Sequence, residues 1–354
     1  MKLTSLRKKI DSIDKEITLL LNKRASLAKN VGKLKNRTGS GIYVPGREAA
    51  IYKNILGKNK GPLSDNALRA IYREIMSSSL SLEKSLSIAY LGPEATFTNI
   101  AAIKKFGSQV EYSSCNSITE VFREVELSRS DYGVVPVENS IEGAVSHTLD
   151  MLINSDLKIC SEVLLEISHN LIGRASSMKA IKKVYSNPQV FGQCRSWLDS
   201  HLRGVEQIEI STTSKAAEIA SRDRNACAIA STLAAEKYKL RILARGIEDI
   251  ANNITRFLVI GLDIPASTKK DKTSIIFSVK DKVGALHDML APFKKNKVNL
   301  TKIESRPSKR KAWEYYFFVD MLGHYQDTNV KKALKELGKQ CSYFKVLGSY
   351  PVGM

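Results

Sequence analysis

Several long cationic side chains near the start of the chain stand at spacings that suit the binding of a small dianion. Arg24 and Lys35 are 11 positions apart, which on a helix leaves about 20° of net rotation and about 16 Å of rise. They therefore share one helical face. Arg7 lies 17 positions before Arg24, so on the same helix it would be about 25 Å away and on another face. If Arg7 serves the same site, it must come from a second chain.

These cations belong to a helical pattern that spans residues 1–86. Over its first 35 residues, apolar side chains recur at the spacing of a helix that buries one stripe, namely Leu6, Ile10, Ile13, Ile17, Leu20, Leu27, Val31 and Leu34. We expect a first helix to about Arg37, a second from Arg47, and a third from about Ser64, which suits an N-cap. A first helix this long needs partner helices from its own or another subunit.

The pattern changes twice after the helical region. Residues 87–265 alternate short apolar or β-branched runs such as SIAYL, YGVVPV and TRFLVIG with helical stretches, which predicts α/β layers around a mostly parallel sheet. Residues 273–354 read strand, helix, strand, strand, helix, strand. That βαββαβ order predicts a ferredoxin-like α+β domain. We therefore expect three domains, at 1–86, 87–265 and 273–354.

Composition narrows the function classes. The net charge of +19 at pH 7 invites a nucleic-acid interpretation, but no arginine-rich tail, zinc-finger spacing or RNP-like motif accompanies it. We therefore predict no nucleic-acid partner. No apolar run approaches the roughly 18 residues of a membrane span, so we predict a cytoplasmic protein without a membrane partner. The five cysteines and five histidines show no metal-binding spacing.

Several strings in a fixed order give the chain a family resemblance over nearly its whole length. They are YLGPEATFT, GVVPVENSIEGAV, HNLIG, NITRF, GAL and ESRP. The chain resembles the bacterial bifunctional chorismate mutase–prephenate dehydratases. The resemblance implies an all-helical mutase domain, a two-lobed α/β dehydratase domain like the periplasmic binding proteins, and a C-terminal ACT domain. It implies no cofactor and no metal.

In the mutase domain the resemblance implies catalytic roles for Arg24, Lys35, Glu48 and Glu83, and substrate binding by Arg7, Arg47 and Ser79. Chorismate rearranges to prephenate without nucleophile, acid or metal. The reaction needs a dicarboxylate held in a compact shape and positive charge at the ether oxygen, which arginine forks and a lysine supply. Val44 stands where some relatives have an aspartate, so Glu48 would contact the substrate hydroxyl alone. Glu83 is glutamine in some relatives, and a glutamate donates a hydrogen bond only when protonated.

In the dehydratase domain the resemblance marks the TRF signature of Thr255, Arg256 and Phe257. Thr255 would donate a hydrogen bond to the departing ring hydroxyl while carbon dioxide leaves, and Arg256 would pair with a substrate carboxylate. Further substrate-binding residues implied by the resemblance are Thr96, Glu138, Asn139, Ser140, Ser186 and Gln193.

In the ACT domain the resemblance implies an L-phenylalanine site made of two loops. Its residues would be Gly284, Ala285, Leu286, His287, Glu304, Ser305 and Arg306. We therefore predict a feedback-inhibited enzyme of phenylalanine biosynthesis that converts chorismate to prephenate and prephenate to phenylpyruvate. It would work as a homodimer or a dimer of dimers. The alternative is an amino-acid-sensing module without catalysis, which would have no need of Thr255.

Overall fold

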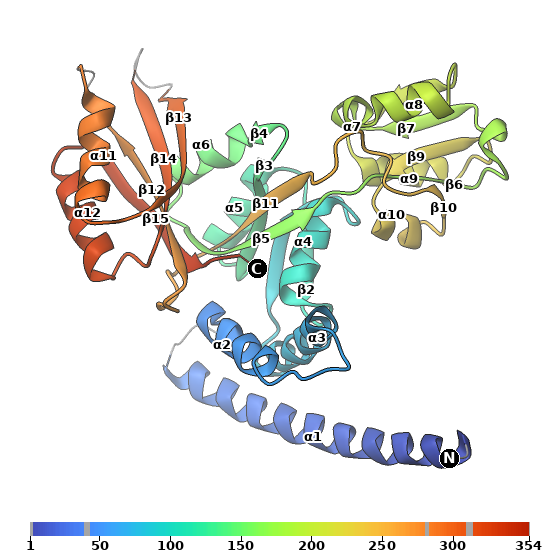
Figure 1. The fold of residues 1–354 in the computed structure, drawn as a ribbon, viewed down its shortest axis with the longest axis horizontal. Helices are drawn as coiled ribbons and strands as arrows, with labels where there is room; N and C mark the ends of the chain where they lie inside the picture. The colour runs from blue at the N-terminus through green and yellow to red at the C-terminus, as the bar shows by residue number, and fades with distance from the viewer. Residues whose placement is uncertain (1–2, 39–42, 280–282, 309–313, 354) are drawn as a thin grey trace. The chain divides into compact units, whose positions relative to one another are not determined.

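The computed structural model describes residues 3–38, 43–279, 283–308 and 314–353. These residues fall into two units (Figure 1). The first contains Met1–Ser87 and Lys105–Tyr112, and the second contains Ile88–Lys104 and Ser113–Met354.

The first unit is helical, as the sequence predicts. Its main helices are α1 (Leu3–Thr38), α2 (Pro45–Leu56) and α3 (Asp65–Glu83). Ser64 caps α3, because its hydroxyl oxygen accepts a hydrogen bond from the backbone N–H of Ala67 at 3.2 Å. Gly32 of α1 lies so close to α3 that a Cβ there would be 2.8 Å from the Cα of Glu83. Glycine at this position therefore allows the two helices to approach closely.

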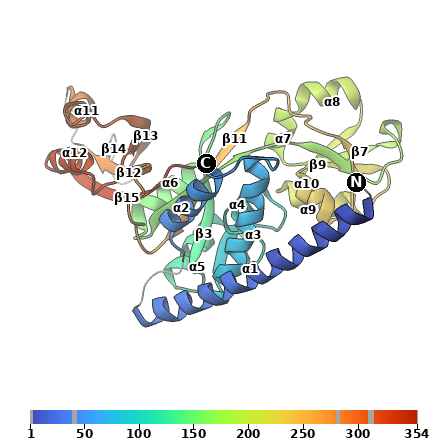
Figure 2. The ribbon, with the colours of Figure 1, turned by 60° about the horizontal axis from the view of Figure 1, so that its bottom comes forward.

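Helix α1 leaves its apolar stripe open to solvent in the single chain. Both views show one continuous helix whose N-terminal half extends beyond α2 and α3 (Figure 1 and Figure 2). Ile10, Ile13 and Leu20 are 56%, 53% and 62% exposed. None of the described helices is long and apolar enough to cross a membrane.

Two α/β lobes follow, and most of their residues belong to the second unit. The first lobe has a sheet of order β2-β1-β3-β11-β5, with β4 paired to β3. Its elements are β1 (Ser87–Leu91), α4 (Phe97–Phe106), β2 (Glu111–Cys115), α5 (Ile118–Glu126), β3 (Tyr132–Asn139), β4 (Gly143–Ala144), α6 (Ser146–Asn154), β5 (Lys158–Glu166) and β11 (Ile254–Gly261).

The second lobe lies in the chain between β5 and β11 (Figure 1). Its sheet has the order β10-β6-β9-β7-β8. Its elements are β6 (Asn170–Gly173), the short 3₁₀ helix η1 (Met178–Ala180), β7 (Lys183–Ser186), α7 (Pro188–Gln193), α8 (Arg195–His201), β8 (Glu206–Glu209), α9 (Thr213–Ala220), β9 (Ala226–Ala230), α10 (Thr232–Lys237) and β10 (Arg241–Ala244).

The prediction of a mostly parallel sheet is wrong. Strand β1 pairs with β3 in parallel, and β7 pairs in parallel with β8 and β9. Strand β11, however, pairs antiparallel with both β3 and β5, and β6 pairs antiparallel with β9 and β10. The reason is the chain path. Strand β5 leads out of the first lobe and β11 leads back into it, so the two neighbours run in opposite directions.

The C-terminal domain has the predicted βαββαβ order. It consists of β12 (Asp271–Ser278), α11 (Ala285–Lys295), β13 (Leu300–Pro307), β14 (Tyr315–Leu322), α12 (Thr328–Gly338) and β15 (Tyr343–Pro351), with sheet order β13-β14-β12-β15. Ile276, Phe318 and Leu347 of this sheet join the same buried cluster as Val135 and Ile159 of the first lobe. The two domains therefore share part of one hydrophobic core.

Candidate active sites

A pocket in the helical unit gathers most of the residues predicted for the mutase site. Its empty volume, counted together with the part that is open to solvent, is about 590 Å³. Five cationic and two carboxylate side chains line it, so it carries a positive charge that suits a dianion. They are Arg24, Lys35, Arg47, Arg73, Lys105, Glu48 and Glu83.

Two contacts between α1 and α3 organise one side of this pocket. The guanidinium of Arg24 donates to the hydroxyl of Ser79, which in turn donates to the carbonyl of Ile75 at 2.8 Å. The ammonium of Lys35 lies 2.9 Å from a carboxylate oxygen of Glu83. The structure thus brings together Arg24, Lys35, Ser79 and Glu83 from helices that the sequence predicts separately. Their roles toward a substrate stay predictions.

Glu48 also lines the pocket, and residues that the sequence did not indicate hold it there. Its Oε2 accepts a hydrogen bond from the Tyr43 hydroxyl at 2.7 Å and lies 3.0 Å from the ammonium of Lys105. The Tyr43 ring packs against Phe106, with ring centroids 5.0 Å apart. Tyr43 precedes α2 and Lys105 lies far along the chain, so no helical spacing relates either of them to Glu48.

The remaining mutase positions differ in where they lie relative to the pocket. Arg47 and Val44 both line the pocket and are exposed there. Arg7 does not line it and lies near the start of α1, among exposed residues. Within one chain the structure therefore leaves Arg7 away from the other cations, as the helical spacing predicts.

In the first lobe the threonine of the TRF signature lies opposite Asn139. Thr255 of β11 is in register with Asn139 at the end of β3. The Asn139 amide nitrogen donates to the Thr255 hydroxyl at 2.9 Å and to the side-chain oxygen of Asn253 at 2.6 Å. The Asn139 side-chain oxygen accepts from the backbone N–H groups of Ile141 and Glu142. This turn fixes which end of the amide faces Thr255.

Gln193 continues this polar network from α7. Its amide nitrogen donates to a carboxylate oxygen of Glu142 at 2.7 Å, and its amide oxygen lies 2.8 Å from Nε2 of His169 and 3.3 Å from the amide nitrogen of Asn253. Burial lowers the pKa of His169, which favours the neutral ring. Its Nδ1 is buried without a hydrogen-bond partner among the described residues. His169 opens the HNLIG string, but it has no partner at a recognisable spacing, so the sequence alone does not predict its place at this site.

Other predicted dehydratase residues hold the local structure in place. Ser140 accepts from the backbone N–H of Ile254 at 2.9 Å. Thr96 donates to the Leu91 carbonyl at 3.2 Å, and the fully buried Ser186 donates to the Ile229 carbonyl at 3.0 Å. Phe257 is 1% exposed within β11. Their contact with a substrate stays a prediction.

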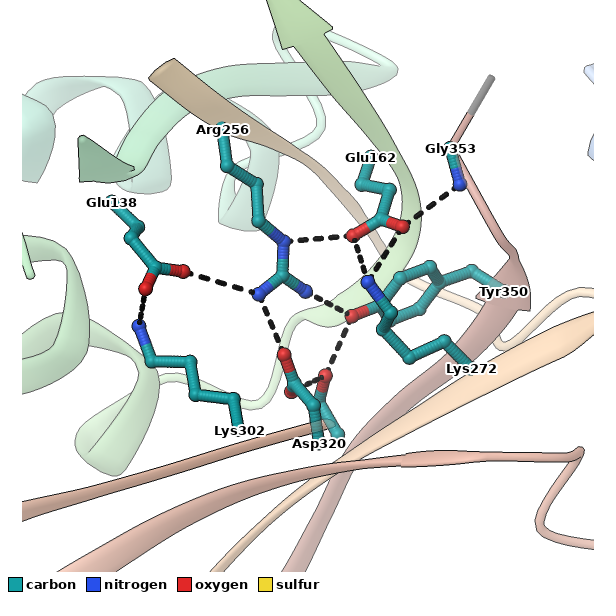
Figure 3. Close-up of polar contacts among 9 residues, drawn as sticks. Glu138, Glu162, Arg256, Lys272, Lys302, Asp320, Tyr350 and Gly353 are labelled. Atoms are coloured by element: carbon teal, nitrogen blue, oxygen red, sulfur yellow. Dashed lines mark hydrogen bonds and ion pairs between the residues drawn. The ribbon is translucent and has the colours of Figure 1, made fainter. Parts of the chain in front are cut away.

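Arg256 lies in a buried ionic cluster with C-terminal domain residues (Figure 3). Its guanidinium is 2.7 Å from Glu162 and 2.6 Å from Asp320, and it donates to the Tyr350 hydroxyl at 2.8 Å. Although burial opposes its charge, Tyr350 and these two carboxylates keep the pKa of Arg256 above its ordinary value. Glu138 is 3.7 Å away and pairs more closely with Lys302 of β13, at 2.9 Å. In this conformation the guanidinium of Arg256 is bound by protein side chains. Substrate binding by Arg256 stays a prediction.

The predicted effector residues fall on two elements of the C-terminal domain. Gly284 has φ of 76° and stands at the N-cap of α11, where Ala285 is buried, Leu286 is partly exposed and His287 is exposed. Along β13, Ser305 is exposed, whereas Glu304 and Arg306 are half-buried on the opposite face. Arg306 lies 2.9 Å from Asp150 of α6. Their role in binding an effector stays a prediction.

Comparison with known proteins gives the same order of domains along the chain. Residues 6–84 match the family model of chorismate mutase type II, residues 88–264 that of prephenate dehydratase, and residues 273–339 that of the ACT domain. A prephenate dehydratase from Arthrobacter aurescens, solved in complex with L-Phe, superposes with a TM-score of 0.70 at 31% identity and covers 75% of this chain and 90% of its own.

Several relatives match nearly the whole chain. A bifunctional chorismate mutase/prephenate dehydratase from Aquifex aeolicus is 52% identical over 353 residues, which cover 99% of this chain and 98% of the relative. A protein of the same description from Pseudomonas aeruginosa is 46% identical over 355 residues, covering 99% and 97%. The chain therefore belongs to the family of bifunctional chorismate mutase/prephenate dehydratases.

Proposed function

We propose that the chain is an enzyme with two activities, the first being conversion of chorismate to prephenate in the helical pocket. This isomerisation breaks the ether C–O bond and forms a C–C bond with no proton transfer. Arg24 and Arg47 have the forked donors that hold carboxylates. Lys35 places positive charge where the ether oxygen gains negative charge, and fixed charges of this kind lower the barrier without reorganisation.

The second activity is the conversion of prephenate to phenylpyruvate, with release of carbon dioxide and water. The ring loses its carboxylate as CO₂, the electron pair left behind drives out the ring hydroxyl, and aromaticity follows. Thr255 accepts a hydrogen bond from Asn139, so its own hydrogen is left to be donated to the departing hydroxyl. The departing hydroxide takes its proton from solvent to become water, and a hydrogen bond from a positioned side chain assists its departure. Neither reaction needs a cofactor or a metal.

L-Phenylalanine is the proposed feedback inhibitor, bound by the C-terminal domain. Support comes from the ACT match at residues 273–339 and from the relative solved with L-Phe. A bound effector alters catalysis only if it favours one arrangement of the chain over another. The core shared by this domain and the first lobe offers a physical route for such an effect.

We also propose a homodimer, or a dimer of dimers, in the cytoplasm. The exposed apolar stripe of α1 favours a second copy of the same helical unit as its partner. A paired α1 would also supply Arg7 to the pocket of the neighbouring chain. The three domains of the proposed enzyme span residues 1–86, 87–265 and 273–354.

The observation that best supports two activities is that one chain contains both a cation-lined pocket and the hydrogen-bonded pair of Thr255 and Asn139. The test is an ultraviolet assay of the full chain with chorismate or prephenate as substrate, with and without L-phenylalanine. We expect chorismate to be consumed and phenylpyruvate to form from either substrate, more slowly when the effector is present. Binding of L-phenylalanine without turnover of either substrate would favour the sensing module instead.

A further inference from the structure

Lys105 is a charged pocket residue that lies outside the mutase motifs and outside the mutase family match. The mutase match ends at residue 84, and Lys105 lies within the dehydratase match at 88–264. In the structure, however, the segment Lys105–Tyr112 is part of the helical unit. Lys105 is therefore a residue of the dehydratase sequence whose side chain lines the mutase pocket.

Its contacts are specific. The Lys105 ammonium lies 3.0 Å from Oε2 of Glu48, and the two side chains are only 17% and 15% exposed. The same ammonium lies 5.7 Å from the centroid of the Tyr43 ring. Tyr43 donates to the same carboxylate oxygen. Two donors thus converge on one oxygen of Glu48 from different parts of the chain.

These two contacts determine which carboxylate oxygen of Glu48 can bind a ligand. With Oε2 engaged, Oε1 has no partner among the described residues and can accept a hydrogen bond from a substrate hydroxyl. A glutamate without such tethers would be attracted to the neighbouring cations of the pocket and would neutralise groups that should hold the substrate carboxylates. Val44 offers no second carboxylate at this side of the pocket.

We propose that Lys105 is a positioning residue of the mutase site, which with Tyr43 holds Glu48 ready to accept the substrate hydroxyl. The mutase site is then completed by a segment outside the mutase-matched sequence. This inference rests on the proposed mutase activity and deepens it. Misplacing a group that orients substrate lowers turnover by about a hundredfold in unfavourable cases.

The experiment uses the full chain with Lys105→Met, and Lys104→Met as the matched control. Lys104 is the preceding residue, is exposed, and contacts the Leu164 carbonyl instead of the pocket. We expect Lys105→Met to lower kcat/KM for chorismate by about tenfold to a hundredfold, while turnover of added prephenate stays native. Lys104→Met should leave both activities native, and Lys105→Arg should restore most mutase activity because a guanidinium also pairs with a carboxylate.

A double-mutant cycle with Glu48→Gln separates positioning from a general effect of charge. If Lys105 acts through Glu48, Lys105→Met should cause little further loss in the Glu48→Gln background. Equal losses in both backgrounds, or mutase kinetics within twofold of native in Lys105→Met, would overturn the inference.

If Lys105→Met unfolds the helical unit, the Tyr43→Phe variant tests the inference instead. It removes the hydrogen bond from Tyr43 to Glu48 without changing the charge of the pocket, and it should lower mutase turnover. A native chain without mutase activity would instead reject the proposed function.

Discussion

At the scale of single residues, hydrogen-bond direction decides what Thr255 can do. The side-chain oxygen of Asn139 is occupied by two backbone donors, so its NH₂ group must face Thr255. Thr255 then accepts one hydrogen bond and retains its own hydrogen for donation. Thr255 as a whole is 9% exposed, so water competes little for that hydrogen. A poor acid is thereby oriented as a hydrogen-bond donor.

We expect Thr255→Val to lower prephenate turnover by about 10²- to 10⁴-fold, the scale of a lost proton donor. Valine keeps the shape and removes the hydroxyl, so the strand pairing of β11 should be retained. Thr255→Ser is the control, because it keeps the donor. The measurement is phenylpyruvate formation, with chorismate consumption by the same protein as the check on folding. Undiminished phenylpyruvate formation by the valine variant would show that Thr255 is not the donor.

His169 makes stability depend on pH. Burial lowers its pKa in the folded chain, whereas in the unfolded chain its pKa is about 6.5. Below that value the unfolded state takes up the proton more readily, so the stabilisation is lost as pH falls through about 6.5. Native protein should therefore lose more stability between pH 7.5 and 5.5 than His169→Gln does. Urea midpoints at both pH values measure this, with the exposed His201→Gln as control, and equal losses in native and His169→Gln would contradict it.

At the scale of elements, strand β11 contacts polar groups of the dehydratase lobes on one face and the C-terminal domain on the other. Successive side chains of a strand alternate between its faces, and Thr255 and Arg256 accordingly meet different groups. Thr255 contacts Asn139 within the polar network that also includes Gln193, whereas Arg256 contacts Asp320 and Tyr350 of the C-terminal domain. Burial raises the pKa of Tyr350, which keeps its hydroxyl protonated. One strand therefore connects the proposed catalytic threonine with the proposed regulatory domain.

We expect Arg256→Met to destabilise the chain by about 3–5 kcal/mol, the usual cost of leaving buried charges without their partner. Glu162 would keep Lys272, which lies 2.8 Å away, but Asp320 would lose its only ion-pair partner in the part of the chain that the structure describes. Arg241→Met, on an exposed position of β10, is the control. Chemical denaturation of both variants measures the effect. Equal stability of the two would show that the cluster contributes little.

The sequence predicted local features better than long-range ones. The N-cap at Ser64, the shared face of Arg24 and Lys35, and the βαββαβ order depend on spacings within one element or between neighbours. The insertion of β11 between β3 and β5 and the partners of Arg256 depend on contacts between residues far apart in the chain. Periodicity carries no information about such pairings. Lys105 was missed for the same reason, since its helix reads as an ordinary amphipathic stretch.

At the scale of the whole molecule, the C-terminal domain contributes to the hydrophobic core of the first lobe. Its sheet contributes Ile276, Phe318 and Leu347 to a core shared with the first lobe. Deleting residues 270–354 would expose that core and would leave Arg256 without Asp320 and Tyr350. The activity of such a truncated protein would therefore not distinguish loss of regulation from loss of stability. Point substitutions on the outer face of β13 are the better test.

We expect Ser305→Phe to weaken inhibition by L-phenylalanine at least severalfold and to leave uninhibited prephenate turnover native. Ser305 is exposed, so a larger side chain can be accommodated without disturbing the core, yet it would occupy the proposed effector site. Thr301→Phe, also exposed on β13, is the matched control and should stay fully inhibited. Dose–response curves with added prephenate measure both. Native sensitivity of the Ser305 variant would place the effector elsewhere.

The proposed dimer leads to a prediction about two chains at once. Arg7 and Arg24 lie on the same helix but about 25 Å apart, and only Arg24 lines the pocket. If a partner supplies Arg7, each complete mutase site takes Arg7 from one chain and Arg24 from the other. Arg7→Ala or Arg24→Ala alone should then remove most chorismate turnover and leave prephenate turnover intact.

Mixing the two inactive variants should restore mutase activity. In a heterodimer of the two variants, one site carries both substitutions and the other site carries neither, so one of its two sites is intact. Random pairing at equal concentrations makes about half of the dimers mixed. Subunit exchange should therefore return about a quarter of native mutase activity. The measurement is chorismate consumption after incubation, with subunit exchange followed by differently tagged chains. Either variant mixed with itself is the control. Demonstrated exchange without any return of activity would show that Arg7 and Arg24 do not complete one site across two chains.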